Sequence, residues 1–379
     1  MKRFYRLYVF SLVLLSLLVL EVGARFLHPQ DKFAWHVSEP RYLQISDGFP
    51  DFEIHKKSLI EVTKAGYTYY PYHLYAIAPI KTETANFTDY YSSRLVPESV
   101  PLEDADEVVW FFGGSTMQDL GAPDKLTIAN AFAKRLRKNG INPHVRNFGV
   151  GGFQSSLELT KFTELLRQVP KEEQPTWVFF YDGFNDAGFG FDVRPGLYQE
   201  DISEKIKDLV GHKFGRLSLY MLSESLAAYS VFWKAYLHPH IIGKLYKHQI
   251  TEGMDYQESL EKAISIYIQN VLMTKAVCEV HNIKCRFILQ PMIFTKKNLT
   301  SFEQEVLSIE PALRVAFFKD FYMQAKAVLQ SFPEFIDLTT VFDNSKYADF
   351  YDIGHVSPAS GAKIGDFLAR YLIHAMKSQ

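Results

Sequence analysis

The sequence contains few cysteines, little glycine and proline, and no excess of charge of either sign. Its 379 residues include two cysteines, Cys278 and Cys285, which excludes a disulfide scaffold but allows one bridge in an exported chain. Lys and Arg number 41 against 43 Asp and Glu, so the chain lacks the basic field that a nucleic-acid binder needs. With 21 Gly and 17 Pro, it has no long linker or low-complexity region. We therefore expect a folded chain without a nucleic-acid partner.

Only one long apolar run occurs, and it lies at the N-terminus. Lys2, Arg3 and Arg6 precede residues 7–20, which are apolar apart from one tyrosine and two serines. Positive residues followed by an apolar run are typical of an export signal that leaves the N-terminus inside. The chain after about residue 28 is therefore expected to lie outside the cytoplasm.

The apolar run can act as a membrane anchor or as a cleavable signal. It is shorter than a span of about 20 residues, but Glu21 and Arg25 lie one helical turn apart and can pair while the helix continues. Val22-Gly23-Ala24 resembles a small-residue cleavage site. We expect residues 1–27 to be a retained anchor, and secretion after cleavage is the alternative.

Aromatic residues are abundant, at 15% of the chain. Some lie in solid apolar runs that predict buried strands, at 108–112 and 177–181. Others gather in residues 65–92 and in 229–236. Their tyrosines suit stacking on sugars or a membrane interface, and a packed antiparallel extension is an equally good interpretation of residues 65–92.

Strand and helix patterns alternate from Glu107 onwards, which predicts an α/β fold with a parallel sheet. The predicted strands are 108–112, 145–148, 177–181, 286–289 and 335–338, and the predicted helices are 128–138, 157–169, 256–281 and 358–376.

The domain organisation follows from these patterns. Residues 1–27 are the anchor, 28–104 an aromatic-rich extension and 105–379 the α/β domain. No strand pattern occurs between about 187 and 255, where pieces such as 217–233 predict a helical insertion.

Several segments that follow predicted strands carry groups suited to chemistry. Ligands of parallel sheets bind beyond the carboxyl ends of the strands, so these segments are expected to lie together. In Gly113-Gly114-Ser115-Thr116 the glycines allow a sharp turn that leaves Ser115 exposed at the start of the next helix, where serine equally suits a helix cap. No Gly-Lys-Ser/Thr follows, which excludes a P-loop.

Two further segments can stabilise negative charge, and a third offers a base. Glycine amides in Asn147-Phe148-Gly149-Val150-Gly151-Gly152 can bind an anion, although a tight turn is their commoner use. Asp182-Gly183-Phe184-Asn185-Asp186 offers an amide side chain to an oxyanion, or closes a turn. Near the C-terminus, His355 and Asp352 offer a base and the carboxylate that orients it.

Taken in order, these segments resemble the four blocks of the SGNH hydrolases, the GDSL-type esterase and lipase superfamily. The blocks are Gly-Gly-Ser-Thr at 113–116, Asn-Phe-Gly-Val-Gly-Gly at 147–152, Gly-Phe-Asn-Asp at 183–186 and Asp-Ile-Gly-His at 352–355. The resemblance covers about 105–190 and 285–376, but neither 28–100 nor the insertion. Gly114 departs from the more common Gly-Asp-Ser; many membrane-anchored bacterial relatives also have Gly-Gly-Ser.

The resemblance implies a flavodoxin-like three-layer α/β/α sandwich with about five parallel strands. It also implies that Ser115 is the nucleophile, that His355 is the base, and that Asp352 orients the imidazole. The oxyanion hole would consist of the amides of Ser115 and Gly152 and the side chain of Asn185.

Two assignments stay open at this point. Gly149 and Gly151 lie beside Gly152 and could donate in its place. Asp182 and Asp186 are further carboxylates near the site, and we expect them to close turns or support the site residues.

An exported hydrolase of this kind would meet acylated envelope material. We expect a serine esterase that removes O-acyl groups, O-acetyl groups in particular, from an extracytoplasmic glycan or lipid. The alternatives are an acyltransferase on envelope polysaccharide and a non-catalytic glycan-binding or assembly protein with the same fold. No cofactor is implied, and no metal, since the closest histidine pair, His238 and His240, lacks a carboxylate spaced to complete a site.

Overall fold

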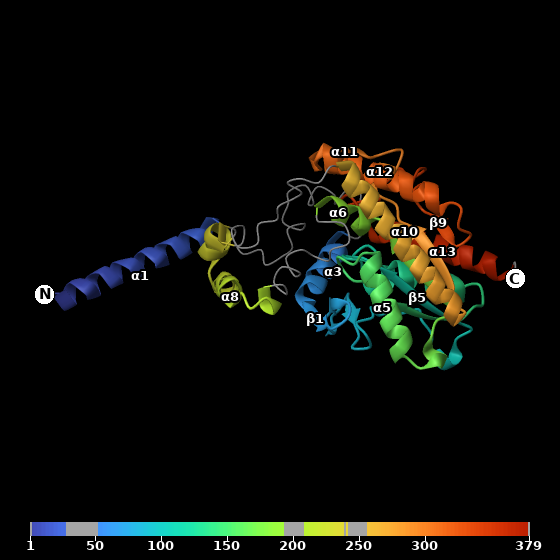
Figure 1. Cartoon of the computed structure of the whole chain (residues 1–379), viewed down its shortest axis with the longest axis horizontal. Coiled ribbons are helices and arrows are strands. Elements are labelled where there is room, and N and C mark those ends of the chain that lie inside the picture. Colours follow the sequence, from blue (N-terminus) through green and yellow to red (C-terminus); the bar gives the residue numbers. More distant parts are fainter. Residues whose placement is uncertain (1, 28–51, 193–207, 239, 242–255, 378–379) are drawn as a thin grey trace. The chain divides into compact units, whose positions relative to one another are not determined.

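The computed structural model describes residues 2–27, 52–192, 208–238, 240–241 and 256–377 (Figure 1). Two compact units make up the chain: residues 1–32 with 197–252, and residues 33–196 with 253–379. Residues 28–51 of the predicted extension lie outside the described residues. So do residues 193–207, 239 and 242–255 of the predicted insertion.

The larger unit contains one parallel sheet, two short antiparallel pairs and several long helices. Its strands are β1 (Tyr67–Tyr70), β2 (Leu74–Ile77), β3 (Ile80–Lys81), β4 (Asn86–Phe87), β5 (Glu107–Gly113), β6 (Pro143–Asn147), β7 (Trp177–Asp182), β8 (Lys284–Leu289) and β9 (Phe335–Asp337). Its helices are α3 (Phe52–Ala65), α4 (Ile128–Arg137), α5 (Ser155–Gln168), α6 (Phe184–Asp192), α10 (Tyr256–His281), α11 (Ser301–Ile309), α12 (Ala312–Leu329) and α13 (Pro358–Lys377).

The central sheet has five parallel strands in the order β6-β5-β7-β8-β9. This is the order of flavodoxin-like folds, with β5 and β7 at the switch point where the chain reverses direction across the sheet. Helix α4 packs on α13, whereas α10 packs on α5 and α12, which gives one helical layer on each face. The predicted three-layer α/β/α sandwich is confirmed.

Both faces of the sheet are covered, which explains why its strands are apolar at successive positions. All six residues of β7 are buried, and so are all residues of β5 after Glu107. Aromatic rings stack between neighbouring strands: Phe111 on Phe179 at 5.1 Å, and Phe112 on Phe180 at 5.2 Å. The predicted burial of the strand aromatics is therefore confirmed.

The predicted strands and helices of the α/β domain are all present, with ends shifted by a few residues at most. For instance, the helix predicted over 256–281 is α10 with the same bounds, and the strand predicted over 145–148 is β6. Elements that the patterns did not reveal are α3, β1 to β4, α6, α11 and α12. The extra strands are two to four residues long, which is too short for an alternating pattern to be recognised.

The aromatic extension is folded as antiparallel strands beside the sheet. Strand β1 pairs with β2 from Tyr67 opposite Ile77 to Tyr70 opposite Leu74, and β3 pairs with β4. The packed antiparallel interpretation of residues 65–92 is therefore the one that the structure shows. A bridge from Arg94 to Asn147 links this region to β6.

The smaller unit combines the N-terminal helix with part of the insertion. Helix α1 (Lys2–Leu27) contains a stretch, Tyr8–Leu27, that is long and apolar enough to cross a membrane, as a signal sequence also would be. The insertion contributes α8 (Phe214–Tyr229) and a helical segment that includes a π-turn at Trp233–Leu237. The insertion is thus helical where it is described.

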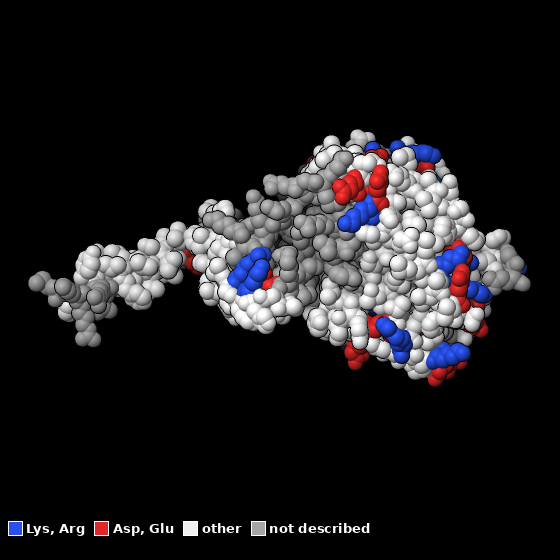
Figure 2. Space-filling view, viewed as in Figure 1, with Lys and Arg blue, Asp and Glu red and all other residues white. Residues whose placement is uncertain are grey.

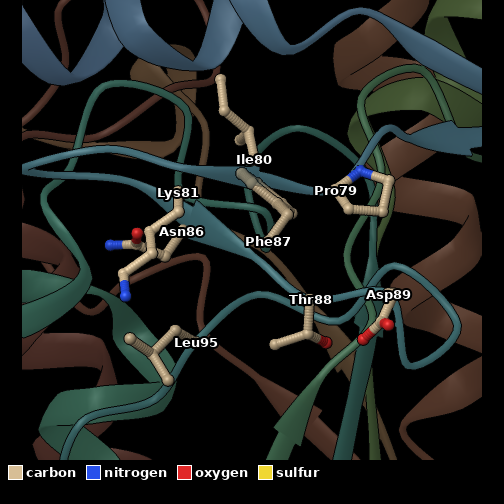
Figure 3. A pocket seen from close by; sticks show the side chains of 8 residues that line it. All are labelled: Pro79, Ile80, Lys81, Asn86, Phe87, Thr88, Asp89 and Leu95. Atoms are coloured by element: carbon tan, nitrogen blue, oxygen red, sulfur yellow. The ribbon is translucent and has the colours of Figure 1, made fainter.

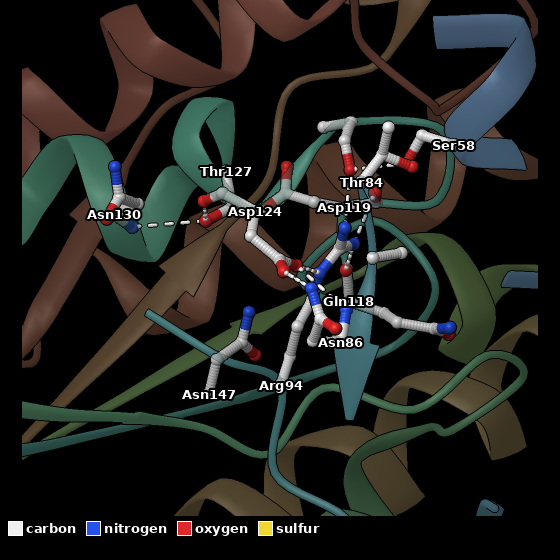
Figure 4. Close-up of polar contacts among 12 residues, drawn as sticks. Ser58, Thr84, Asn86, Arg94, Gln118, Asp119, Asp124, Thr127, Asn130 and Asn147 are labelled. Carbon is white, nitrogen blue, oxygen red and sulfur yellow. Dashed lines mark hydrogen bonds and ion pairs between the residues drawn. The ribbon is translucent and has the colours of Figure 1, made fainter. Parts of the chain in front are cut away.

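Arg94 connects the extension to the turns that follow β5 (Figure 4). Its side chain is fully enclosed and donates from Nε to Asp124 at 3.0 Å. Its Nη1 donates to the carbonyls of Gln118 and Asp119 at 2.6 and 2.8 Å, and its Nη2 donates to the carbonyl of Ala122. One guanidinium group therefore fixes the chain from 118 to 124.

Buried carboxyl groups lie under the carboxyl end of β7. Burial, and the nearby charges of Asp182 and Asp186, raise the pKa of Glu158 on α5 well above its ordinary value of 4.5. Burial and the charge of Asp186 likewise raise the pKa of Asp182. Asp186 accepts from the hydroxyl and amide of Ser155 at 2.5 and 3.2 Å, and burial raises its pKa to about 6. The cluster ties α5 to the start of α6.

Replacing Arg94 with methionine is expected to destabilise the protein by about 3 to 5 kcal/mol, because the carboxylate of Asp124 would stay buried without its partner. Chemical denaturation in detergent, followed by tryptophan fluorescence, measures the loss. The matched control is Arg137→Met, which breaks an exposed pair with Glu98 and should cost no more than about 1 kcal/mol. Equal losses for the two variants would show that Arg94 does not hold the loop.

Glu158→Gln is expected to flatten the fall in stability towards high pH. The folded state holds the Glu158 proton above the pH at which the unfolded chain releases it, so stability drops as pH rises past about 4.5, by up to about 1.4 kcal/mol per pH unit for this group. Glutamine cannot ionise and removes that slope. Denaturation of both proteins between pH 5 and 9 tests this, with exposed Glu172→Gln as the control. A variant with the wild-type slope would contradict it.

Candidate active site

Ser115 lies at the carboxyl end of β5, two residues after Gly113. It belongs to a series of turns, in which the amides of Met117 and Gln118 donate to the carbonyl of Gly114 at 3.1 and 2.9 Å. The prediction that Ser115 starts the next helix is wrong, because α4 begins only at Ile128, where Thr127 caps it. The contacts of Arg94 hold this long connection in turns.

Ser115, His355 and Asp352 form a continuous hydrogen-bonded chain. The Oγ of Ser115 lies 2.7 Å from Nε2 of His355, and Nδ1 of the same ring lies 2.7 Å from Oδ2 of Asp352. The imidazole is buried, at 8% exposure, and so shielded from bulk water. A hydroxyl, an imidazole and a carboxylate in this order have the geometry of a nucleophile, its general base and the group that orients the base.

The segment 352–355 is folded back on itself by its own carboxylate. Oδ1 of Asp352 accepts from the amides of Gly354 and His355 at 2.9 and 2.7 Å, which leaves Oδ2 to face the imidazole. The amide of Tyr351 donates to the carbonyl of His355 at 3.1 Å and closes the loop. The spacing of Asp352 and His355 is therefore set by local turns.

A buried ion cluster holds the approach to this loop. Lys296 contacts Glu303 at 2.8 Å and Asp349 at 2.9 Å, and all three side chains are fully enclosed. Glu303 also accepts from the amide of Asp349 at 2.9 Å. It accepts from the amide of Thr300 as well, and together these two residues cap the N-terminus of α11. Lys296 thus fixes the course of the chain before His355 through buried polar contacts, as Arg94 fixes the chain after Ser115.

Aromatic rings enclose the imidazole. The ring of Tyr351 stacks on that of His355 at 5.6 Å and 16°, and the ring of Phe184 meets it edge-on at 5.8 Å. His55 of α3 lies edge-on to Tyr351 at 4.7 Å, and burial lowers its pKa to about 4, so it is neutral at pH 7. Tyr351 and Phe184 adjoin the sequence blocks and could have been found from them. No sequence signal indicated His55, since it lies about 300 residues from its neighbours.

Asn185 lies in the first turn of α6, beside the backbone of Gly114. Its Nδ2 donates to the carbonyl of Phe153 at 2.5 Å, which fixes the carboxamide and leaves its second N–H for another acceptor. A Cβ added to Gly114 would come within 2.1 Å of this Nδ2. The space that an aspartate would need at position 114 is thus taken by Asn185, which gives a physical reason for the glycine there.

The amides of the 147–152 segment can now be told apart. The amide of Gly149 donates to Oδ1 of Asn147 at 3.0 Å, so it is already engaged. Within the described residues, no hydrogen bond is found for the amides of Ser115, Gly151 and Gly152. A Cβ on Gly151 would lie 3.9 Å from that of Ser115, so this turn adjoins Ser115. Gly149 is thereby excluded as an amide donor to a ligand, whereas the amides of Gly151 and Gly152 are both available.

The β1–β2 hairpin borders the same turn. The hydroxyl of Tyr75 donates to the carbonyl of Gly151 at 3.1 Å, and the hydroxyl of Tyr67 lies 3.6 Å from where a Cβ of Gly151 would be. The ring of Tyr67 meets that of Tyr75 edge-on at 5.1 Å and is 63% exposed. The aromatic extension therefore places an exposed tyrosine near Ser115.

A cavity of about 500 Å³ lies elsewhere, against β3 and β4 (Figure 3). Its lining residues are Pro79, Ile80, Lys81, Asn86, Phe87, Thr88, Asp89 and Leu95. None of them is a predicted site residue. In the part of the chain that the structure describes, no group of three His, Cys, Asp or Glu side chains is placed to hold a metal ion.

The chain was compared with known proteins. No family model matches it, and neither does any curated protein sequence. Solved structures that resemble it include an esterase from Pseudoalteromonas (10% identity, TM-score 0.37, 72% of this chain and 100% of that one) and a lipolytic protein of the G-D-S-L family from Veillonella parvula (12%, 0.39, 70% and 98%). A third is an acetylxylan esterase from Geobacillus stearothermophilus (13%, 0.33, 71% and 94%). The chain is thus similar to structures named as esterases and GDSL-type lipolytic proteins, the group that its sequence blocks resemble.

Proposed function

We propose that this protein is a serine ester hydrolase of the SGNH type that acts on O-acyl groups. The observation that carries the proposal is the hydrogen-bonded chain from Ser115 through His355 to Asp352, with 2.7 Å at each contact. It joins three side chains that lie up to 240 residues apart in sequence at the carboxyl end of the sheet. The imidazole of His355 is buried and flanked by aromatic rings, and the hydrogen-bonded series is arranged for proton transfer to and from Ser115.

In the first half of the reaction, the Oγ of Ser115 attacks the acyl carbonyl carbon while its proton passes to Nε2 of His355. The carboxylate of Asp352 accepts from Nδ1–H and stabilises the imidazolium that forms. The carbonyl oxygen becomes an oxyanion that accepts from the amide of Ser115, from Nδ2 of Asn185 and from the amide of Gly152, which the spacing of the sequence block favours over that of Gly151. When the C–O bond breaks, the imidazolium returns its proton to the leaving alcohol, and the acyl group stays on Ser115.

In the second half, a water molecule attacks the acyl-enzyme and gives its proton to His355. Collapse of the second tetrahedral intermediate breaks the bond to Oγ, releases the carboxylic acid and restores the serine hydroxyl. If a sugar hydroxyl replaced the water, the same steps would transfer the acyl group instead.

The substrate that we propose is an O-acylated, in particular O-acetylated, glycan or lipid outside the cytoplasm. The N-terminal helix supports this location, because a retained α1 would anchor the enzyme with its α/β unit on the outer side, and a cleaved one would release it there. The exposed ring of Tyr67 near Ser115 suits stacking on a sugar.

A fluorophosphonate probe tests the activity directly. The wild-type full-length protein should be labelled, and Ser115→Ala should not, because only an activated serine attacks the probe. The same pair should be assayed on acetylated sugars and short-chain aryl esters, with and without an acceptor sugar.

The outcomes distinguish the three candidate functions. Label and released acid that both depend on Ser115 support the esterase. Label with acyl transfer to the acceptor, and little free acid, indicates the acyltransferase. No label, while a known esterase reacts under the same conditions, indicates a binding protein and overturns the proposal.

Asn185→Ala is expected to lower kcat by about 10² to 10³, roughly 2.7 to 4 kcal/mol, because one donor to the oxyanion is lost. KM should change far less, since the interaction strengthens in the transition state. Steady-state kinetics on an aryl ester measure both, with exposed Asn139→Ala as the matched control and circular dichroism as the check on folding. Turnover within about threefold of wild type would refute the role of Asn185.

A further inference from the structure

The two charged residues near the end of α1 are used to hold the insertion. Glu21 accepts from the hydroxyl of Ser230 at 2.7 Å and from the amides of Val231 and Phe232, both at 3.1 Å. These are the first amides of the helical segment that follows α8, so Glu21 caps its N-terminus. Val231 is buried in this corner, at 5% exposure.

Arg25 completes the junction from the next turn of α1. It donates to Glu21 at 2.7 Å and to the carbonyl of Tyr229, the last residue of α8, at 3.3 Å. One acid and one base of α1 thus satisfy the backbone at the end of one insertion helix and the start of the next. Figure 1 shows the helical segment that follows α8 at the C-terminal end of α1.

The position of Glu21 fixes the level at which the insertion lies. The apolar stretch of α1 runs from Tyr8 to Leu27, so Glu21 lies six residues, or about 9 Å, inside its end. A carboxylate at such a depth in a membrane is costly unless it is paired. Figure 2 shows the described part of α1 free of charge along most of its length, with charge only near the junction. Ser230, Val231 and Phe232, which donate to Glu21, therefore have to lie at the same depth in the membrane as Glu21.

Helix α8 is exposed over most of its surface, and Ser223 is its only buried residue. The hydroxyl of Ser223 lies 3.1 Å from Nε1 of Trp233 and 3.0 Å from Nδ1 of His238. Four exposed apolar residues at helical spacing form a stripe along α8, and their exposures are Leu219 (45%), Leu222 (56%), Leu226 (38%) and Tyr229 (84%). Phe214 (52%) and Met221 (60%) are exposed as well. Only Arg216 and Glu224 are charged among the 16 residues of α8.

We propose that residues 208–238 form an interfacial membrane-binding element, and that the apolar stripe of α8 inserts at the headgroup level of the bilayer that α1 spans. The lipid surface is the occupant that the contacts favour, because Glu21 and Arg25 hold the C-terminal end of the stripe at α1, whose own apolar side chains are exposed. Tyr229 and Trp233 are residues suited to this boundary. Because Glu21 and Arg25 bind residues 229–232, they fix the depth of this element relative to α1.

The proposal rests on α1 crossing the membrane rather than on the hydrolase activity. It is tested with the full chain in vesicles of phosphatidylcholine and phosphatidylglycerol. Cys278 and Cys285 are joined by a disulfide, so an added cysteine is the only free thiol and can carry a nitroxide label. The labelled variants are Leu222→Cys and Tyr229→Cys on the stripe, Leu14→Cys in α1, and Leu313→Cys, which is 61% exposed on α12.

Collisions of the label with oxygen, which enters the bilayer, and with a water-soluble nickel chelate are measured by electron paramagnetic resonance. At Leu222 and Tyr229 we expect nickel access to be at least about fivefold lower than at Leu313 and oxygen access at least as high, because the stripe lies about 5 to 10 Å within the interface. Leu14 should show the deepest signal.

Each other result overturns the proposal in a recognisable way. Nickel access at Leu222 equal to that at Leu313 places the stripe in water. Low access to both reagents means that protein covers it, and dilution of the labelled protein with unlabelled protein then shows whether a second copy does so. Nickel access at Leu14 shows that α1 itself does not span. None of these results depends on Ser115.

Discussion

The guanidinium group of Arg94 is completely enclosed, and the loop that carries Ser115 depends on it. It donates to Asp124 and to the carbonyls of Gln118, Asp119 and Ala122, so the chain after Ser115 has a fixed course without helical hydrogen bonds. The cost of burying a charge is offset because all three nitrogens donate, through four hydrogen bonds in all. Arg94 belongs to the aromatic-rich extension and follows its strands β1 to β4, and for this reason the extension and the active-site loop fold as one structure.

Lys296 has the same relation to the other half of the site. Its contacts with Glu303 and Asp349 precede the turn in which Asp352 binds the amides of Gly354 and His355. Two buried cations therefore position the two loops whose side chains, Ser115 and His355, meet at 2.7 Å. Hydrogen-bonded ion clusters of this kind tolerate few alternative geometries, which suits a reaction in which small displacements of the reacting groups are costly.

The carboxyl groups beneath the site have a different part. Burial raises the pKa values of Glu158 and Asp182, which favours their protonated, uncharged forms near Asn185. Asp186 instead binds Ser155 and holds the start of α6, where Asn185 is located. Asp182 and Asp186, the other carboxylates near the site, thus support its surroundings. They take no part in the hydrogen bonds that join Ser115, His355 and Asp352.

Much of the fold was predictable from the sequence. The solid apolar strands follow from a sheet covered on both faces, and the blocks around Ser115, Asn185 and His355 follow from the rule that parallel strands carry ligands at their carboxyl ends. Asp352 and His355 are joined by local turns, so their pairing was also within reach of the sequence. The short strands β1 to β4 were not, because strands of two to four residues show no period.

The tertiary structure alone decided which distant groups meet. Four contacts join segments that lie far apart in the chain: His55 with Tyr351, Arg94 with residues 118–124, Tyr67 with Gly151, and Glu21 with the first amides after Ser230. Only the structure shows that Asn185 fills the space beside Gly114 and that the amide of Gly149 is engaged. The sequence by itself determined the elements and the chemical groups, because strand and helix periodicity and turn chemistry are local. The side-chain surroundings of each group depend on long-range packing, which has no periodic signature along the chain.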